Sequence, residues 1–484
     1  MFTRILQWIR EVLNRMIGTS SIKQSLGVDV AISPYMATSL MTWSLMYLNR
    51  AAWLYQGDPG GGPPPDLAHD RDLRSLNLPA AIAGEIARAV TIEMKVAIEG
   101  SPRAVYLAEQ FENIQPKLRQ MVEYGAAKGG LMFKPYLVDD QIKVDYIQAD
   151  MFYPIAFDAN GNITSCVFAD QRTIGNKFYT RLEYHNMTPE GCEIRNLAFK
   201  SDSISSLGQP VPLASIDEWA ELQPEATITG IDRPLFAYFR YPMANNVDPT
   251  SPLGVSCYSR VVELIHDADR QWSELLWEFE SGERAIYVDA DAFTKDKKGN
   301  PVLPHRRLYR TMAQGGDLTA EEMFHEWTPD FREQNILAGL EAMLKKIEFN
   351  CGLAYGTLSD PNTVDKTATE IVSSRQRSYA TITDTQKSLR GALEQLLWSM
   401  DQWATIGTLA PRGAYTMVID FDDSVIVDKD MQMQADRQTT TMGAMPKYIF
   451  LMRNYGLDEK TAKQWIADNL AEQPADLFNN PQGA

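Results

Sequence analysis

The stretch that most constrains this chain is a predicted pair of helices, Phe331–Phe349 and Thr367–Trp403, joined by a short breaker loop. The loop, 351–362, concentrates Gly, Ser, Asp, Pro and Asn, which favour leaving the helical region. In the first helix six apolar residues recur at the three-and-four spacing of one stripe: Ile336, Leu337, Leu340, Met343, Leu344 and Ile347. Two such helices suit a structure built along an axis.

The second helix begins with a capping box, in which Thr367 and Glu370 can satisfy each other's free amides. No proline interrupts it before Trp403. At ~1.5 Å per residue it would be roughly 55 Å long, well beyond the ~8 to 20 residues usual in globular proteins. We therefore expect a bend or break at Ser388–Gly391, because glycine costs about 1 kcal/mol in a helix and permits a kink.

Composition restricts the function more than the fold. The 484 residues carry a formal net charge of −17, which argues against a protein that grips nucleic acid through Lys and Arg. A surface past which DNA slides remains compatible with this charge. The four cysteines are far apart and form no metal-ligand spacing, so neither a disulfide framework nor a metal or other cofactor is predicted, and a reducing compartment fits: Cys166, Cys192, Cys257 and Cys351.

The N-terminal region, 1–75, is predicted to contain a helix and a Gly/Pro-rich loop. No apolar run approaches the ~20 residues needed to span a bilayer, and no signal-peptide pattern is seen, so we expect a soluble protein that is not secreted. Met1–Gly18 is amphipathic, which favours a helix docked on its own domain or on a neighbouring subunit over an interfacial membrane helix. Asp58–Asp66 is a loop, because Gly and Pro runs refuse regular structure.

The next part of the chain predicts an antiparallel α+β region. Leu78–Met94 has the apolar face of a helix, and a second helix is expected over Leu107–Tyr124. A hairpin turn is predicted at Asp158–Asn162 and a loop at Gln209–Glu225. Short strands are expected at Tyr136–Val138, Ile142–Ile147, Ser165–Phe168, Tyr179–Tyr184, Cys192–Ala198 and Leu235–Phe239.

A long amphipathic helix, with an apolar face from Tyr258 to Phe279, follows the loop Asn245–Gly254 and comes before the helix pair. Between them lies a compact segment, Arg284–Asp330, with strands expected at 285–288 and 307–309, a turn at 297–300 and one helical turn near 320–323. After the pair we expect two acidic strands, Tyr415–Phe421 and Ser424–Val427, then helices over Asp428–Leu470, the last starting at 456–459. From Ala471 the Gln-, Asn- and Pro-rich tail predicts disorder.

Three passages, in this order, resemble one protein family. They are Leu76–Ala87, then Arg233–Phe239 continuing through Asn245–Ser256 into the acidic helix, and finally Lys366–Ile371. This order is similar to the portal proteins of tailed bacteriophages, of the type found in long, non-contractile-tailed phages of Gram-positive hosts. The resemblance covers about 76–470, and the Gly/Pro-rich insertion near Asp58 departs from it.

The resemblance implies a homo-oligomeric ring, usually of twelve subunits, at one vertex of the capsid. Double-stranded DNA would enter through the ring during packaging and leave through it during ejection. The implied partners are the terminase large subunit, the head-tail adaptor, and the major capsid and scaffold proteins, with no membrane partner. The implied location is the virion, with assembly in the host cytoplasm.

The family's parts can be carried over region by region. The resemblance implies a wing at 76–251, stem helices at 252–283 and 331–350, a clip at 284–330, a tunnel loop at 351–366, a long helix returning to the wing at 367–427, a crown at 428–470 and a tail at 471–484. The tunnel loop would face the DNA channel with small, polar residues, and Lys366 and its neighbours would touch DNA transiently. Its candidate residues are Gly352, Tyr355, Gly356, Thr357, Ser359, Asn362 and Lys366.

Two readings compete with a conduit that has no catalytic activity. A metal-dependent nuclease could use His266, Asp267 and Asp269, but His266 and Asp267 would face different sides of a helix and no second ligand cluster completes a site. A minor capsid or head-tail adaptor protein would not need two long helices.

Asp420, Asp422 and Asp423 are read as a solvated strand end in preference to a structural calcium site. Phosphate-binding GxxxxGK[ST], HExxH and GxSxG motifs are absent, so the energy for DNA movement would come from a partner.

Overall fold

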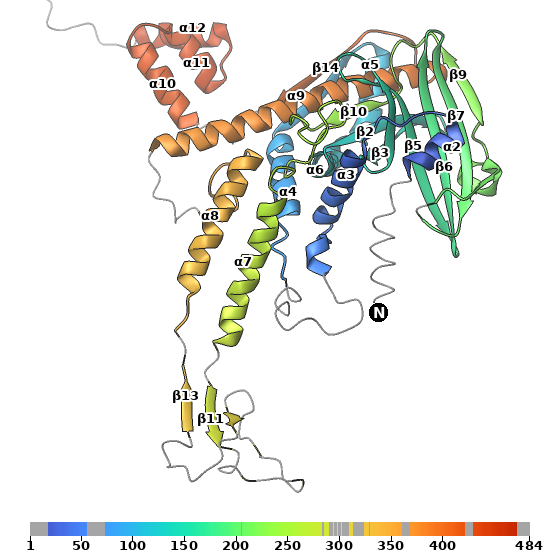
Figure 1. The fold of residues 1–484 in the computed structure, drawn as a ribbon. Helices are drawn as coiled ribbons and strands as arrows, with labels where there is room; N and C mark the ends of the chain where they lie inside the picture. Colours follow the sequence, from blue (N-terminus) through green and yellow to red (C-terminus); the bar gives the residue numbers. More distant parts are fainter. Residues whose placement is uncertain are drawn as a thin grey trace, which may run out of the picture. The chain divides into compact units, whose positions relative to one another are not determined.

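We describe a computed structural model of the chain (Figure 1). It describes residues 18–55, 73–204, 206–282, 285–289, 294, 298, 302, 309–312, 324–328, 330–360, 368–421 and 429–471. The chain divides into two units, Met1–Ile419 and Asp420–Ala484, which are treated separately below. Helices and antiparallel sheets are mixed in the first unit, which confirms the α+β class. The predicted N-terminal helix, the Gly/Pro-rich loop, the strand Ser424–Val427 and almost all of the tail lie outside the described residues.

Helical elements dominate the first part of the described chain. They are α2 (Thr19–Leu26), α3 (Pro34–Tyr47), the 3-10 turn η1 (Ala52–Tyr55), α4 (Leu78–Thr91), α5 (Pro102–Glu112), the 3-10 turn η3 (Gln115–Lys117) and α6 (Leu118–Lys128). The predicted apolar face of α4 is buried at Ile82, Ile86 and Val90, and α4 packs against α6 and α3.

Two boundaries in this region differ from the prediction. The helix expected over Leu107–Tyr124 is two helices, with η3 between them, because Pro116 lacks the amide needed to continue α5 and instead begins a new turn. Met94 does not extend α4 but begins strand β1 (Met94–Gly100), which pairs with β14 (Tyr415–Phe421). The apolar spacing at Met94 fits a helix equally well, so only the distant partner strand decides its conformation.

Two antiparallel sheets carry most of the strands. The smaller has the order β10-β2-β3, formed by Ala237–Arg240, Gly130–Val138 and Gln141–Gln148. The larger has the order β4-β5-β6-β7-β8, with β9 also pairing β7; its strands are Phe152–Phe157, Ile163–Ile174, Lys177–Thr188, Gly191–Ser201, Gln209–Val211 and Glu225–Thr229. The predicted turn at Asp158–Asn162 is confirmed: the Asp158 Oδ1 accepts hydrogen bonds of 2.8 Å from the amides of Asn160 and Asn162.

The predicted loop Gln209–Glu225 is wrong in part. It contains β8 and two 3-10 turns, η4 (Leu213–Ser215) and η5 (Asp217–Trp219). Trp219 is 2 % exposed, packs with Ala198 and Ile216, and donates its indole N–H to Asp170 at 3.2 Å. One buried indole therefore organises a segment whose proline content indicates only loop.

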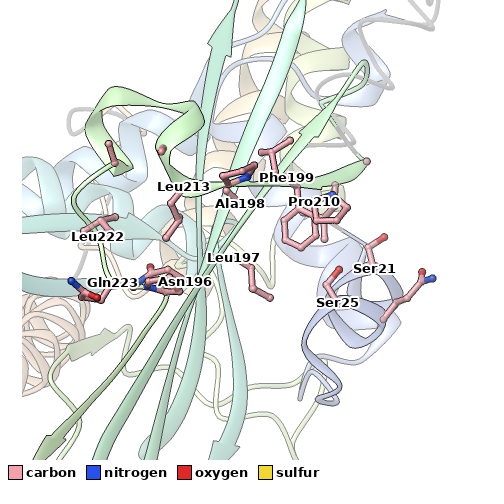
Figure 2. A pocket seen from close by; sticks show the side chains of 18 of the residues that line it. Ser21, Ser25, Asn196, Leu197, Ala198, Phe199, Pro210, Leu213, Leu222 and Gln223 are labelled. Carbon is pink, nitrogen blue, oxygen red and sulfur yellow. The ribbon is translucent and has the colours of Figure 1, made fainter.

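A groove of about 1090 Å³ lies between α2 and the β7–β8 edge of the larger sheet. Figure 2 shows Ser21 and Ser25 of α2 on one side of it and Phe199, Leu213 and Leu222 on the other. Its described lining mixes apolar side chains with serine and amide side chains.

A buried ionic network joins the two sheets. The Lys134 Nζ of β2 lies 2.5 Å from the Glu183 carboxylate of β6, which also contacts the Arg181 guanidinium at 3.1 Å and the His185 Nε2 at 2.7 Å. Burial alone would raise the pKa of Glu183, but the Lys134 charge and the His185 hydrogen bond hold it well below its usual range. The carboxylate is therefore an anion that fixes three surrounding cationic or polar groups.

The segment expected to start the long helix is not helical. Helix α7 begins at Val262 and ends at Ser281, whereas 252–261 is irregular and buried over 252–258. A Cβ on Gly254 would lie 2.1 Å from the Gly129 carbonyl oxygen, so the two backbones touch there. Tyr258 is fully buried and donates its hydroxyl to the Trp43 carbonyl at 2.8 Å. Contacts with two distant segments thus override the helical apolar spacing.

The segment between the two long helices contains a three-stranded sheet of order β12-β11-β13. Its strands are Tyr309–Met312, Ala285–Asp289 and Phe324–Trp327, of which the first pair is parallel and the second antiparallel. The prediction at 285–288 is confirmed, the strand expected at 307–309 begins at Tyr309, and β13 was missed. The helical turn expected near 320–323 lies outside the described residues.

The second unit is helical, as predicted, with α10 (Lys429–Thr441), α11 (Lys447–Tyr455) and α12 (Glu459–Ala471). Buried Asp436 of α10 binds the Arg453 guanidinium at 3.3 Å and the Asn454 amide at 3.1 Å, which fixes α11 against α10. Asp458 accepts hydrogen bonds from the Lys460 and Thr461 amides. The predicted start of the last helix is therefore confirmed together with its cap.

Candidate functional site

Helices α7 and α8 (Glu333–Cys351) pack against each other along their length (Figure 1). Of the predicted α8 stripe, Leu340, Leu344 and Ile347 are buried, whereas Leu337 is 41 % exposed. The pair therefore shares a continuous apolar contact, but one end of the predicted stripe is left uncovered by the described part of the chain.

A charged clasp closes the end of the pair next to the three-stranded sheet. Arg332 donates its backbone N–H to the Glu278 carboxylate at 2.8 Å and its guanidinium at 2.6 Å. These hydrogen bonds lower the pKa of Glu278. Gly282 leaves room for the Phe331 ring, which a Cβ would approach to 2.4 Å. Both helix ends are thus held in one register.

The other end of α8 stops at Gly352 for two physical reasons. Gly352 has φ +72°, and the chain closes with hydrogen bonds from the Leu353 amide to the Glu348 carbonyl at 2.9 Å and from the Gly352 amide to the Phe349 carbonyl at 3.4 Å. This is a Schellman motif, which favours glycine. A Cβ here would also lie 2.2 Å from the Thr381 Oγ1 of α9 (Ala368–Ile406). The candidate residue Gly352 is therefore the point where α8 and α9 touch.

A fully buried carboxylate fastens the first part of the loop to α8. Glu348 is 0 % exposed and accepts hydrogen bonds from the Leu358 amide at 2.6 Å and the Ser359 amide at 2.9 Å. The Ser359 hydroxyl lies 3.0 Å from the same carboxylate, and it in turn accepts from the Gly356 amide at 3.2 Å. Two turns earlier on the same face of α8, the Glu341 carboxylate accepts a hydrogen bond from the Asp360 amide at 3.1 Å.

An arginine of α9 lies against two aromatic rings at this junction. The Arg377 guanidinium is 4.4 Å from the centre of the Phe349 ring and 5.2 Å from that of Tyr355. These distances are within the range of cation–π attraction. Its Nη1 is buried and finds no hydrogen-bond acceptor among the described residues. The candidate Tyr355 is therefore part of a packed contact between α8, the loop and α9.

Helix α9 runs without the predicted break at Ser388–Gly391. The Ser388 hydroxyl donates to the Arg240 carbonyl, and a Cβ on Gly391 would meet nothing within 4 Å. A glycine costs about 1 kcal/mol in a helix, but each fully buried leucine contributes about 1.5–3 kcal/mol. The four that flank the glycine hold the helix intact: Leu389, Leu393, Leu396 and Leu397.

The structure places five of the seven candidate loop residues. Gly352 and Ser359 are structural, and Ser359 is only 4 % exposed. Thr357 is exposed and bonds back to the Ala354 carbonyl at 2.6 Å, while Tyr355 and Gly356 are half-buried. Asn362 and Lys366, like the capping residue Thr367, lie outside the described residues.

Sequence reasoning missed the residues that organise this junction. Glu348 falls on the polar side of the α8 pattern, and Arg377 and Thr381 carry no local signal within a long helix. Only the loop's serine, which is able to donate to a carboxylate, could have hinted at an acidic partner.

Two of the three residues considered for the competing nuclease reading, Asp269 and His266, take part in packing. The buried Asp269 carboxylate accepts from the Trp53 indole at 3.1 Å and the Leu76 amide at 2.8 Å, which ties the N-terminal segments to α7. Burial raises the pKa of Asp269. His266 contacts the Trp53 ring at 5.2 Å between ring centres. Within the described residues no three metal-ligating side chains gather. The four cysteines are buried and unbridged.

Comparison with known proteins decides the family. Residues 99–475 match the family model for "Phage portal protein, SPP1 Gp6-like". The chain belongs to this family of phage portal proteins. The matched range includes the larger sheet, α7, α8, the loop and α10–α12, and two of the three short passages lie within it, so the resemblance to this family is confirmed.

Two further comparisons complete the picture. A solved structure, the neck of a native GTA particle computed with C12 symmetry, is 10 % identical to this portal protein, covers 85 % of it and 96 % of its own chain, and has a TM-score of 0.40. No curated protein matches the sequence. In the described part of this portal protein, no helix has both the length and the apolar character needed to cross a bilayer.

Proposed function

We propose that this portal protein forms a ring of about twelve copies at one capsid vertex, through which double-stranded DNA is packaged and later ejected. The observation that carries the proposal is the family match over 99–475. The paired helices α7 and α8, clasped at one end and joined to α9 at the other, fit a rod-like wall element repeated around an axis.

The parts of the subunit take these roles. Helices α7 and α8 would be the stem around the channel, and the three-stranded sheet between them would be the clip that docks terminase and later the head-tail adaptor. Residues 351–366 would be the tunnel loop, α9 would cross the wing, and α10–α12 would form the crown on the capsid side. The two sheets with α4–α6 would be the wing, which contacts capsid and scaffold proteins.

The charge of the chain supports a conduit over a DNA-gripping protein. DNA presents one negative charge per ~1.7 Å of its axis, so an acidic wall repels phosphates and leaves the polymer mobile. The exposed side of α7 bears Glu263, Asp267 and Glu274 beside one cation, Arg270, and the whole chain has a net charge of −17. The energy for translocation would then come from a terminase ATPase, and assembly would take place in the host cytoplasm.

Imaging of the purified protein tests this proposal, with its mass in solution as a second measurement. Rings with a central hole and about twelve-fold symmetry are expected. A chain that stays monomeric or dimeric even with its capsid and scaffold proteins present would count against the ring, and metal-dependent cleavage of DNA by the pure protein would favour a nuclease.

A further inference from the structure

The first half of the tunnel loop, 352–360, is held against α8 at both of its ends, and we call it the fixed limb. It leaves α8 at Gly352 and returns to the side of the same helix at Leu358–Asp360. Glu348, which has no contact with solvent, receives two backbone amides and one hydroxyl from the returning chain. A carboxylate that satisfies several donors in a buried site holds them strongly, because each donor would otherwise stay buried and unbonded.

From this geometry we propose that Glu348 is a positioning residue for the DNA channel. It clamps 358–360 to α8, so that this part of the loop keeps its place as a duplex passes, and the force on it is transmitted to the α8–α9 junction. The inference rests on the proposed conduit function and adds to it which part of the loop is the anchor.

The contacts around the clamp support a rigid root. The Arg377 guanidinium stacks on Phe349 and Tyr355, and the backbone of Gly352 lies against Thr381. The fixed limb is therefore held by α8 from one side and α9 from the other. Of the candidate residues, Gly352 and Ser359 then act by holding the loop, not by touching DNA.

The test uses Glu348→Gln in the full-length protein. The amide side chain keeps an oxygen for the two backbone amides, which bond the same carboxylate oxygen, but it removes the negative charge that strengthens those hydrogen bonds, so the clamp is weakened without a change of shape. Hydrogen exchange at the Leu358 and Ser359 amides is expected to accelerate at least about tenfold, while exchange in the wing strands stays unchanged. Ser359→Ala, which removes only the hydroxyl, should give a smaller acceleration and guards against misfolding of the first variant.

The second readout is DNA packaging with each variant ring. Packaging velocity should fall in the order wild type, Ser359→Ala, Glu348→Gln, following the exchange rate at Ser359 and not the thermal midpoint. Glu190→Gln, which makes the same charge change on an exposed turn of the wing, is the matched control and should package normally.

The two readouts separate the possible failures. Unchanged exchange in Glu348→Gln would overturn the clamp itself. Accelerated exchange with normal packaging velocity would overturn the positioning role and leave the conduit intact. If the wild-type protein forms no ring and supports no packaging, the proposed function fails, whereas the exchange result still reports on the clamp.

Discussion

Replacing Gly352 by alanine should loosen the junction between α8 and α9 by an amount that the structure allows us to work out. Gly352 has φ +72°, a conformation that costs an L-residue roughly 1–2 kcal/mol. The new Cβ would also lie 2.2 Å from the Thr381 Oγ1, and such overpacking typically costs about 1–3 kcal/mol. Together the local opening free energy should fall by about 2–5 kcal/mol.

Hydrogen exchange of the Leu353 amide, which is bonded to the Glu348 carbonyl, measures that local free energy directly. Because 1.4 kcal/mol corresponds to a factor of ten, the exchange rate should rise by a factor between about 30 and a few thousand. Thr381→Ala removes the Oγ1 and should recover the steric part of the loss, so the double variant should exchange more slowly than Gly352→Ala alone.

Gly391→Ala is the matched control on α9. Its Cβ would meet nothing within 4 Å, so it should leave exchange unchanged or stabilise the helix by up to about 1 kcal/mol. An acceleration below about threefold in Gly352→Ala, or no difference made by Thr381→Ala, would refute the reasoning.

Three further predictions follow from the charged groups. Because Arg332 lowers the pKa of Glu278, this clasp stabilises above the unfolded pKa of the carboxyl and is lost as pH falls through its lower folded value. Arg332→Met removes the guanidinium but keeps the backbone N–H, so it should reduce this part of the acid dependence in hydrogen exchange at the α8 start. Lys134→Met should destabilise the wing by about 3–5 kcal/mol, measured by denaturant unfolding, since it leaves Glu183 buried without its closest cation; an unchanged midpoint would contradict the network's role. Burial raises the pKa of Asp269, so its ionised form costs stability as pH rises; Asp269→Asn should keep the fold and reduce this loss in a pH series of thermal midpoints, whereas loss of a DNA-cleaving activity would support a nuclease.

Features set by local chemistry could be predicted from the sequence. The buried stripe of α8, the turn closed by Asp158 and the helix start capped by Asp458 each depend on residues within one or two turns of one another. In such cases spacing and side-chain type are enough to fix the backbone.

Features set by distant contacts could not be predicted. Tyr258 lies in a helical apolar pattern, but its hydroxyl donates to the Trp43 backbone carbonyl and the segment is irregular. The continuity of α9 through Gly391 depends on leucines that bury against the wing. At the candidate site, the sequence marks the loop but not its anchor, because a buried Glu348 looks the same as any solvated acid of an amphipathic helix.

A reconstruction of the assembled ring tests the central claim most directly. The account predicts that α7 and α8 of every copy surround a central channel wide enough for duplex DNA, with the loop after Gly352 at its narrowest point. A ring whose hole is lined by the wing sheets, with α7 and α8 on the outside, would contradict it.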